Sequence, residues 1–298
     1  MIKTIAAAIA LLLPLAADAA EKEAALLAKL RTRVEAVDAR LDGVLGLSIK
    51  DLKTGSVVME LRPAEPFATA SSIKLAVLYE LYRQAEEGRV DLAGLTTPAL
   101  PRVKGGGILQ ELGDHVTLTW RDLAVLMMGW SDNEAANLLI DKVGMDAVNR
   151  RLDAQHLPGM RLRRKMMDLA AAHEGRENVG TPAEMRVLAE TVFAGQGLSP
   201  ERARDLRAVA SMTKSSPFRQ GLPEGVTSLD KSGELEGVRC VTAVVDVPSR
   251  PYSIAIMTAY LKRDADGEAA IRDISAAVYE TFDRLARSSD LGRVISER

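Results

Sequence analysis

Ser71 and Lys74, a serine and a lysine three residues apart, have types and spacing suited to nucleophilic chemistry. At the start of a helix this spacing places both side chains on one face, one turn apart. Unpaired backbone N–H groups and the positive end of the helix dipole would stabilise negative charge beside Ser71. Lys74 directly precedes the apolar run 75–78, and desolvation in such surroundings favours the neutral amine. A neutral lysine can take the serine proton, so the pair predicts a nucleophile with its base.

The Ser-x-x-Lys spacing alone does not select this pair. It also occurs at Ser211/Lys214 and at Ser228/Lys231. For any single copy, an N-cap serine followed by a solvated lysine is the simpler interpretation. Other motifs must therefore decide which copy is catalytic.

Two further short patterns single out Ser71. Ser131-Asp132-Asn133 lies 60 residues after Ser71, in a loop expected between two helices. Lys231-Ser232-Gly233 lies 100 residues further on, just before a long strand pair. Each pattern alone has an ordinary explanation, as a helix N-cap cluster and as a turn. Their conjunction on a helix start, an interhelical loop and an edge strand is far more specific.

Hydrophobic periodicity indicates the elements that position these motifs. Period-two patterns predict strands near both ends of the chain, and helical periodicity fills the middle. The expected strands span 44–52, 56–61, 238–247 and 252–260, and the terminal helices span 21–41 and 269–286. The inner helices are expected at 71–87, 121–129, 133–143, 145–153 and 181–193.

The economical arrangement is an α+β fold, in which one antiparallel sheet is built from both ends of the chain. The terminal helices would flank the sheet, and an all-helical domain would be inserted. We therefore predict a discontinuous α/β domain of residues 21–65 plus 212–290, and a helical domain of residues 66–211.

The three motifs in this order resemble those of the class A β-lactamase and penicillin-recognising serine hydrolase family. The resemblance covers most of the mature chain and includes the run 219–223 before the third motif. Arg161-Leu162-x-Arg164 and Thr181-Pro182 bracket a segment that looks like the Ω loop of this family. The β-lactamase/transpeptidase-like fold that it implies agrees with the periodicity. The resemblance also accounts for the other two Ser-x-x-Lys copies. Lys231 of the Ser228/Lys231 copy belongs to the third motif, and Ser211/Lys214 is assigned a structural role.

The resemblance implies an acyl-transfer role for each motif residue. Ser71 would attack an amide carbonyl and form an acyl-enzyme, and Lys74 would remove its proton. Ser131 would pass a proton to the leaving nitrogen, and Asn133 would hydrogen-bond the amide side chain of the substrate. Lys231 would keep the site positive and favour neutral Lys74 through like-charge repulsion.

The third motif and its neighbours would bind the reacting groups of the substrate. Backbone N–H groups of Ser71 and Glu234 would form the oxyanion hole, where loss of one donor typically costs about 10²–10³ in rate. Ser232, next to Gly233, would bind the substrate carboxylate together with Arg239.

The sequence departs from the family in the Ω loop. Class A β-lactamases activate the deacylating water with a glutamate four residues before an asparagine, and those positions hold Met166 and Ala170. Neither side chain can activate water. Asp168, Glu174 and Glu177 are the nearby carboxylates that a repositioned loop could use instead, and Asp168 is the first to test.

The N-terminal residues predict export. Lys3 precedes the apolar segment 5–17, and Ala17-Asp18-Ala19 is a small-x-small cleavage site, so residues 1–19 resemble a signal peptide. No second apolar run of that length follows, so we expect a periplasmic or extracellular protein without a membrane span after cleavage. Cys240 is the only cysteine, which excludes an internal disulfide, and its apolar surroundings predict a buried side chain.

Composition limits the partners. The formal net charge of −2 gives no case for nucleic acid or acidic lipid. The histidines His115, His156 and His173 show no metal-ligand spacing, and Lys104 with the glycines 105–107 is expected at the rim of the site rather than around a phosphate. We expect a monomer without a cofactor, acting on a small β-lactam or a peptidoglycan-like peptide.

The leading hypothesis is an exported serine hydrolase that opens β-lactams through an acyl-enzyme on Ser71. One alternative is a peptidoglycan D,D-peptidase, or another amidase or esterase, with the same residues. The other is a penicillin-binding protein that turns over slowly. Both alternatives are favoured by the missing glutamate.

Overall fold

The computed structural model describes residues 2–212, 215–289 and 291–295. Its central element is a five-stranded antiparallel sheet in the order β2-β1-β9-β8-β7. The strands are β1 (Val44–Asp51), β2 (Val57–Leu61), β7 (Ser228–Leu235), β8 (Val238–Val245) and β9 (Tyr252–Ala259). Since β1 pairs with β9, the two ends of the chain share one sheet, and the predicted α+β architecture is confirmed. The third motif lies within edge strand β7.

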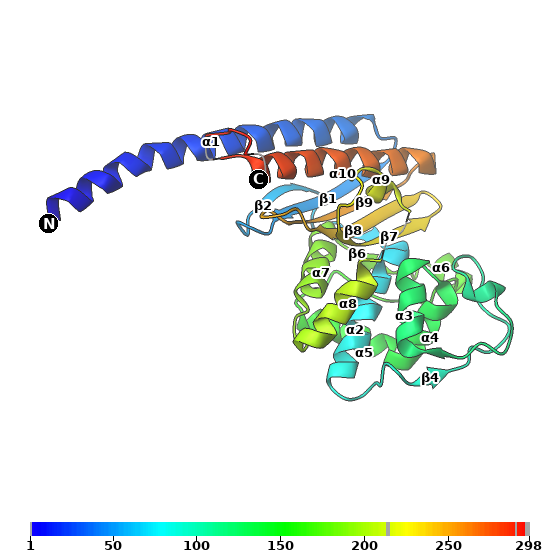
Figure 1. Ribbon diagram of the computed structural model, residues 1–298. Helices are drawn as coiled ribbons and strands as arrows, with labels where there is room; N and C mark the ends of the chain where they lie inside the picture. The colour runs from blue at the N-terminus through cyan, green and yellow to red at the C-terminus, as the bar shows by residue number, and fades with distance from the viewer. Residues whose placement is uncertain (1, 213–214, 290, 296–298) are drawn as a thin grey trace.

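Helix α10 (Asp264–Arg287) and the C-terminal part of the long helix α1 (Ile2–Arg40) lie side by side over one face of the sheet, and the N-terminal part of α1 extends beyond it (Figure 1). Alternate residues of β1, Leu45, Leu47 and Ile49, are fully buried against them. Successive strand side chains point to opposite faces, so this alternation commits one face of β1 to the terminal helices. No helix in the described part of the chain is long and apolar enough to cross a membrane.

The opposite face of the sheet carries the helical layer (Figure 1). It contains α2 (Lys74–Glu86), α3 (Trp120–Gly129), α4 (Asn133–Val143), α5 (Met145–Ala154), α7 (Pro182–Ala194) and α8 (Pro200–Ala210). Helix α2 is buried on almost all sides, in keeping with its high apolar content. Thr119 and Asp122 form a capping box at the start of α3.

Several short elements connect these layers. They are η1 (Ala70–Ile73), η2 (Leu109–Glu111), α6 (Leu169–His173), α9 (Pro217–Gln220), and the short strands β3 (Phe67–Ala68), β4 (Leu95–Thr96), β5 (Leu118–Thr119) and β6 (Val179–Gly180). Two backbone hydrogen bonds between Arg161 and Val179, of 2.9 and 3.1 Å, join the ends of the segment 161–179. We call this segment the Ω loop. Lys214, from the second Ser-x-x-Lys copy, lies outside the described residues.

Candidate active site

Ser71 lies on a tight turn before α2. The sequence predicted one helix from here to residue 87, but Ser71 belongs to the 3₁₀ helix η1 and α2 begins at Lys74. A 3₁₀ helix has three residues per turn, so residues 71 and 74 still stack on one side. Ala70, directly before the serine, has a φ of 46°, a left-handed conformation that is costly for an L-residue.

Edge strand β7 lies close to this turn because Gly233 has no side chain. A Cβ at Gly233 would lie 2.9 Å from the backbone nitrogen of Ser71 and 2.5 Å from the carbonyl oxygen of Thr69. Non-bonded carbon atoms do not approach so closely, so any larger residue would push β7 away from the serine. Gly233 therefore sets the spacing between the nucleophile and the strand that carries the third motif.

Lys74 is fully buried under the motif of the interhelical loop. Its Nζ donates to the carbonyl oxygen of Ser131 at 2.6 Å and to Oδ1 of Asn133 at 2.8 Å. Burial lowers the pKa of Lys74 well below its ordinary value, the charge of Lys231 lowers it further, and Asp132 acts in the opposite direction. The environment thus favours the neutral amine that a general base requires.

Ser131 joins the two lysines. Its Oγ accepts hydrogen bonds from Nζ of Lys74 at 3.3 Å and from Nζ of Lys231 at 3.1 Å. Lys231 also donates to the carbonyl oxygen of Ser232 at 2.7 Å. Ser131 has a φ of 53°, another costly left-handed conformation, and the surrounding contacts hold it there. This arrangement can carry a proton between Lys74 and a group bound above Ser131.

The rim opposite β7 is formed by the glycine-rich segment. Nδ2 of Asn133 donates to the carbonyl oxygen of Gly105 at 3.1 Å. The backbone N–H of Asn133 donates to the carbonyl oxygen of Gly106 at 3.3 Å. Buried Asp132 accepts from the backbone N–H of Leu109 at 2.7 Å. Gly105 and Gly106 both line the cleft, as expected for a rim segment.

A cleft of about 350 Å³ brings the three motifs together. Its lining residues are Ala70, Ser71, Gly105, Gly106, Ser131, Asn133, Arg164, Met166, Met167, Leu169, Asn178, Ser232, Glu234 and Leu235. Lys74 and Lys231 reach this group through their bonds to Ser131. The motif residues selected from the sequence therefore meet around a single cleft.

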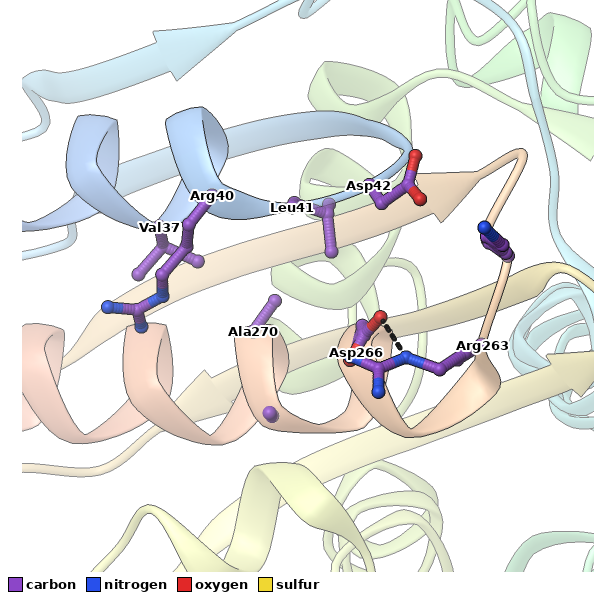
Figure 2. A pocket seen from close by; sticks show the side chains of 9 residues that line it. Val37, Arg40, Leu41, Asp42, Arg263, Asp266 and Ala270 are labelled. Carbon is purple, nitrogen blue, oxygen red and sulfur yellow. Dashed lines mark hydrogen bonds and ion pairs between the residues drawn. The ribbon is translucent and has the colours of Figure 1, made fainter.

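Another hollow lies on the far side of the sheet, between α1 and α10 (Figure 2). Its charged side chains include the ion pair of Arg263 with Asp266, 2.7 Å apart, and none of the motif residues lines it. Among the described residues, no group of three His, Cys, Asp or Glu side chains is placed to hold a metal ion.

The structure does not bring Arg239 to the cleft, contrary to expectation. Its guanidinium donates to Glu268 at 3.0 Å and pairs with Asp264 at 3.1 Å, both on α10. It also donates to the carbonyl oxygens of Leu235 and Val238 at the end of the β7–β8 hairpin. The sequence could not place these partners because the two acids lie on a later helix.

The three candidate deacylation carboxylates are engaged elsewhere. Asp168 is the N-cap of α6, and its Oδ1 accepts a hydrogen bond from the backbone N–H of Ala171 at 3.0 Å. Glu177 pairs with Arg164 at 2.7 Å, and Glu174 pairs with Arg176. None of these three described side chains lines the cleft, and neither does Ala170.

Met166 is held over the cleft by Asn137, a residue that sequence reasoning missed. Oδ1 of Asn137 accepts from the backbone N–H of Met166 at 2.8 Å, and its Nδ2 donates to the Met166 carbonyl oxygen at 3.0 Å. Met167 and Leu169 extend the apolar lining on the same side. An asparagine inside a helix was the only sequence signal for this clamp.

Asn178, also missed, fixes the far end of the Ω loop. Its Oδ1 accepts from the backbone N–H groups of Arg163 at 2.7 Å and Arg164 at 3.0 Å.

Cys240 is buried, as predicted, and burial raises the pKa of its thiol to about 11. A thiol with so high a pKa is a poor nucleophile.

Fold and site together define an active-site serine hydrolase, with a serine at a helix start and two buried lysines that meet at a second serine. The beta-lactamase enzyme family model matches residues 29–282. A beta-lactamase of Streptomyces cellulosae is 28% identical over 224 residues, covering 72% of each chain. The chain belongs to the beta-lactamase enzyme family.

Solved structures support the same assignment. The beta-lactamase of Sphaerobacter thermophilus DSM 20745 has a TM-score of 0.76 and 28% identity, covering 84% of this chain and 95% of its own. A PBP-A mutant, solved as its acyl-enzyme complex with penicillin G, has a TM-score of 0.77 and 25% identity, with 85% and 96% covered. The predicted membership of the β-lactamase family is thereby confirmed.

Proposed function

We propose that this protein is an exported serine hydrolase that opens β-lactam rings through an acyl-enzyme on Ser71. Ser71 Oγ attacks the ring carbonyl, the carbonyl–nitrogen bond breaks, and an ester forms on the serine. Water then cleaves the ester and releases the opened acid. The observation that carries this proposal is the convergence of Lys74 and Lys231 on Ser131 Oγ beside the serine cleft.

The contacts around the cleft support a role for each group in acylation. Neutral Lys74 takes the Ser71 proton, and Ser131 delivers a proton to the ring nitrogen as it leaves. The backbone N–H groups of Ser71 and Glu234 stabilise the developing oxyanion. Ser232 binds the substrate carboxylate.

The other side of the cleft positions the acyl group. Asn133 holds the amide of the acyl side chain from the glycine-rich rim. The leading segment of the chain, residues 1–19, serves as a cleaved signal peptide, and the mature monomer acts outside the cytoplasm. Turnover there would lower the susceptibility of the cell to penicillins.

A second candidate, a penicillin-binding protein with slow turnover, is favoured by the apolar wall of the cleft. Met166 and its neighbours offer no base to the acyl ester, and the nearby carboxylates are engaged elsewhere. A PBP-A mutant similar to this chain was captured as a penicillin G acyl-enzyme. Deacylation is therefore the step that separates the two candidates.

One experiment distinguishes them. Mature protein is incubated with benzylpenicillin, ring opening is followed by absorbance, and intact mass is taken in parallel. Sustained ring opening beyond one equivalent supports the hydrolase, and a persistent adduct on Ser71 with little turnover supports the slow binder. If neither adduct nor turnover is found, β-lactams are not substrates, and peptide amides and esters should be assayed next.

A further inference from the structure

Glu234 adds an unexpected negative charge to the cleft. Its side chain is exposed, and the residue lines the cleft together with Ser71 and Ser232. Among the described residues, no hydrogen bond or ion pair engages its carboxylate. The proposed acylation uses only the backbone N–H of this residue and gives its side chain no role.

The register of β7 shows where this carboxylate lies. Gly233 faces the serine turn, because a Cβ there would meet the Ser71 nitrogen. Strand side chains alternate, so Ser232 and Glu234 point to the same face of β7, and both residues line the cleft. Two strand residues span about 7 Å. The Glu234 carboxylate therefore lies near the substrate group that Ser232 binds.

The cation that could neutralise Glu234 is already engaged. Arg239 is its direct cross-strand partner in the β7–β8 ladder. The guanidinium instead contacts Glu268 at 3.0 Å and Asp264 at 3.1 Å. Glu234 lines the cleft, and just outside it Arg239 is shared between the two carboxylates of α10, so one arginine stands beside three carboxylates at this end of β7. Such a surplus of negative charge repels an anion and attracts a cation.

We propose that Glu234 is a specificity-determining residue that selects acyl donors by the charge of their leaving-group side. Donors with a neutral or cationic group there are favoured, and donors with a bare carboxylate are disfavoured. This inference rests on the proposed acylation of Ser71. The preferred substrates of the site would then carry less negative charge than penicillins, which bear a carboxylate.

The expected size follows from Coulomb's law. Two unit charges about 7 Å apart in water change a rate about three-fold, and a partly desolvated cleft increases this to about ten-fold. The effect also falls as salt screens the charges. These magnitudes are measurable in the second-order rate constant for acylation.

The test uses three forms of one acyl donor with full-length mature protein. Benzylpenicillin is anionic, its methyl ester is neutral, and its diethylaminoethyl ester is cationic. Adduct formation on Ser71 is timed by intact mass for the wild type and for Glu234→Gln, which removes the charge at nearly constant size. Glu236→Gln is the matched control, because Glu236 is exposed two residues further on and does not line the cleft.

We expect Glu234→Gln to speed acylation by the acid about three- to ten-fold and to slow it by the cationic ester about as much. The methyl ester should change less than two-fold, and all differences should shrink at high salt. Glu236→Gln should stay within two-fold for all three donors.

Two results would overturn the inference alone. One is an equal change for all three donors, which would indicate a steric effect. The other is an equal response to Glu236→Gln, which would indicate only the general field of the protein. If the wild type forms no adduct with any donor, the proposed function itself fails, and the inference fails with it.

Discussion

The two walls of the cleft differ in kind. On the wall formed by η1, α2, β7 and the loop between α3 and α4, polar groups converge, and two lysines meet at the hydroxyl of Ser131. On the Ω-loop wall, the side chains that face the cleft include Met166, Met167 and Leu169. In the proposed chemistry the first wall carries the nucleophile, the base and the proton relay, whereas the second presents mainly apolar surface, with Arg164 paired to Glu177.

This difference separates the two halves of acyl-enzyme chemistry. Forming the ester needs the groups around Ser71, whereas cleaving it needs an activated water on one side of the ester. The loop that would supply the base is nevertheless firmly held, by Asn137 at Met166 and by Asn178 near Arg164. The apolar wall is therefore a fixed feature of the structure.

The largest expected effect comes from removing the nucleophile. Ser71→Ala should lower acylation by benzylpenicillin by about 10⁴-fold or more, because no other group on that wall can form the ester. Intact mass after a long incubation measures the adduct, and the thermal midpoint shows that the variant folds. Full hydrolysis by this variant would show that Ser71 is not the nucleophile.

The next largest effect should come from giving the loop wall a base. Met166→Glu should raise the deacylation rate about 10²-fold, since a positioned general base typically contributes about 10²–10⁴. The clamp from Asn137 holds the backbone of residue 166, so the new carboxylate would be presented to the cleft. Decay of a preformed benzylpenicillin adduct, followed by mass, measures this rate.

Met167→Glu is the matched control for that change. It adds the same charge one residue further along on the same wall, and the Met167 side chain reaches toward the glycine-rich rim at Gly105. We expect less than a three-fold change in deacylation. An equal gain from both variants would show that loop charge, and not the position of a base, controls ester cleavage.

The sequence predicted the acylation wall better than the rest of the site, for a physical reason. Ser71, Ser131 and Lys231 lie in short motifs on locally encoded elements, so residue spacing indicated their meeting. Arg239 could not be placed, because its acidic partners come from α10. Likewise, the clamp on Met166 comes from a helix 29 residues earlier in the chain. Contacts of this kind depend on tertiary packing that local patterns do not encode.

The pH dependence of acylation tests the lysine pair. Burial and the charge of Lys231 lower the pKa of Lys74 below its ordinary value of 10.5, so acylation should rise with pH as Lys74 loses its proton below that value. Lys231→Met removes the like charge, raises the pKa of Lys74 and should move this rising limb to higher pH. Rate–pH profiles of adduct formation measure the shift. The exposed turn variant Lys53→Met should leave the limb in place, and an unmoved limb in Lys231→Met would refute the coupling.

The smallest expected effect on acylation comes from loosening the apolar wall. Asn137→Ala leaves two backbone groups of Met166 without partners, which should lower the free energy of unfolding by about 1–3 kcal/mol. Acylation should change less than two-fold, because the Asn137 side chain bonds to Met166 and not to the groups around Ser71. Deacylation should rise a few-fold as Met166 gains freedom to admit water.

Asn149→Ala is the control, since the Asn149 side chain makes the same pair of hydrogen bonds to the backbone N–H and carbonyl oxygen of Leu162, at 2.9 Å each. It should lose comparable stability without the gain in deacylation, and a loss of acylation in Asn137→Ala would show that the two walls work as one unit.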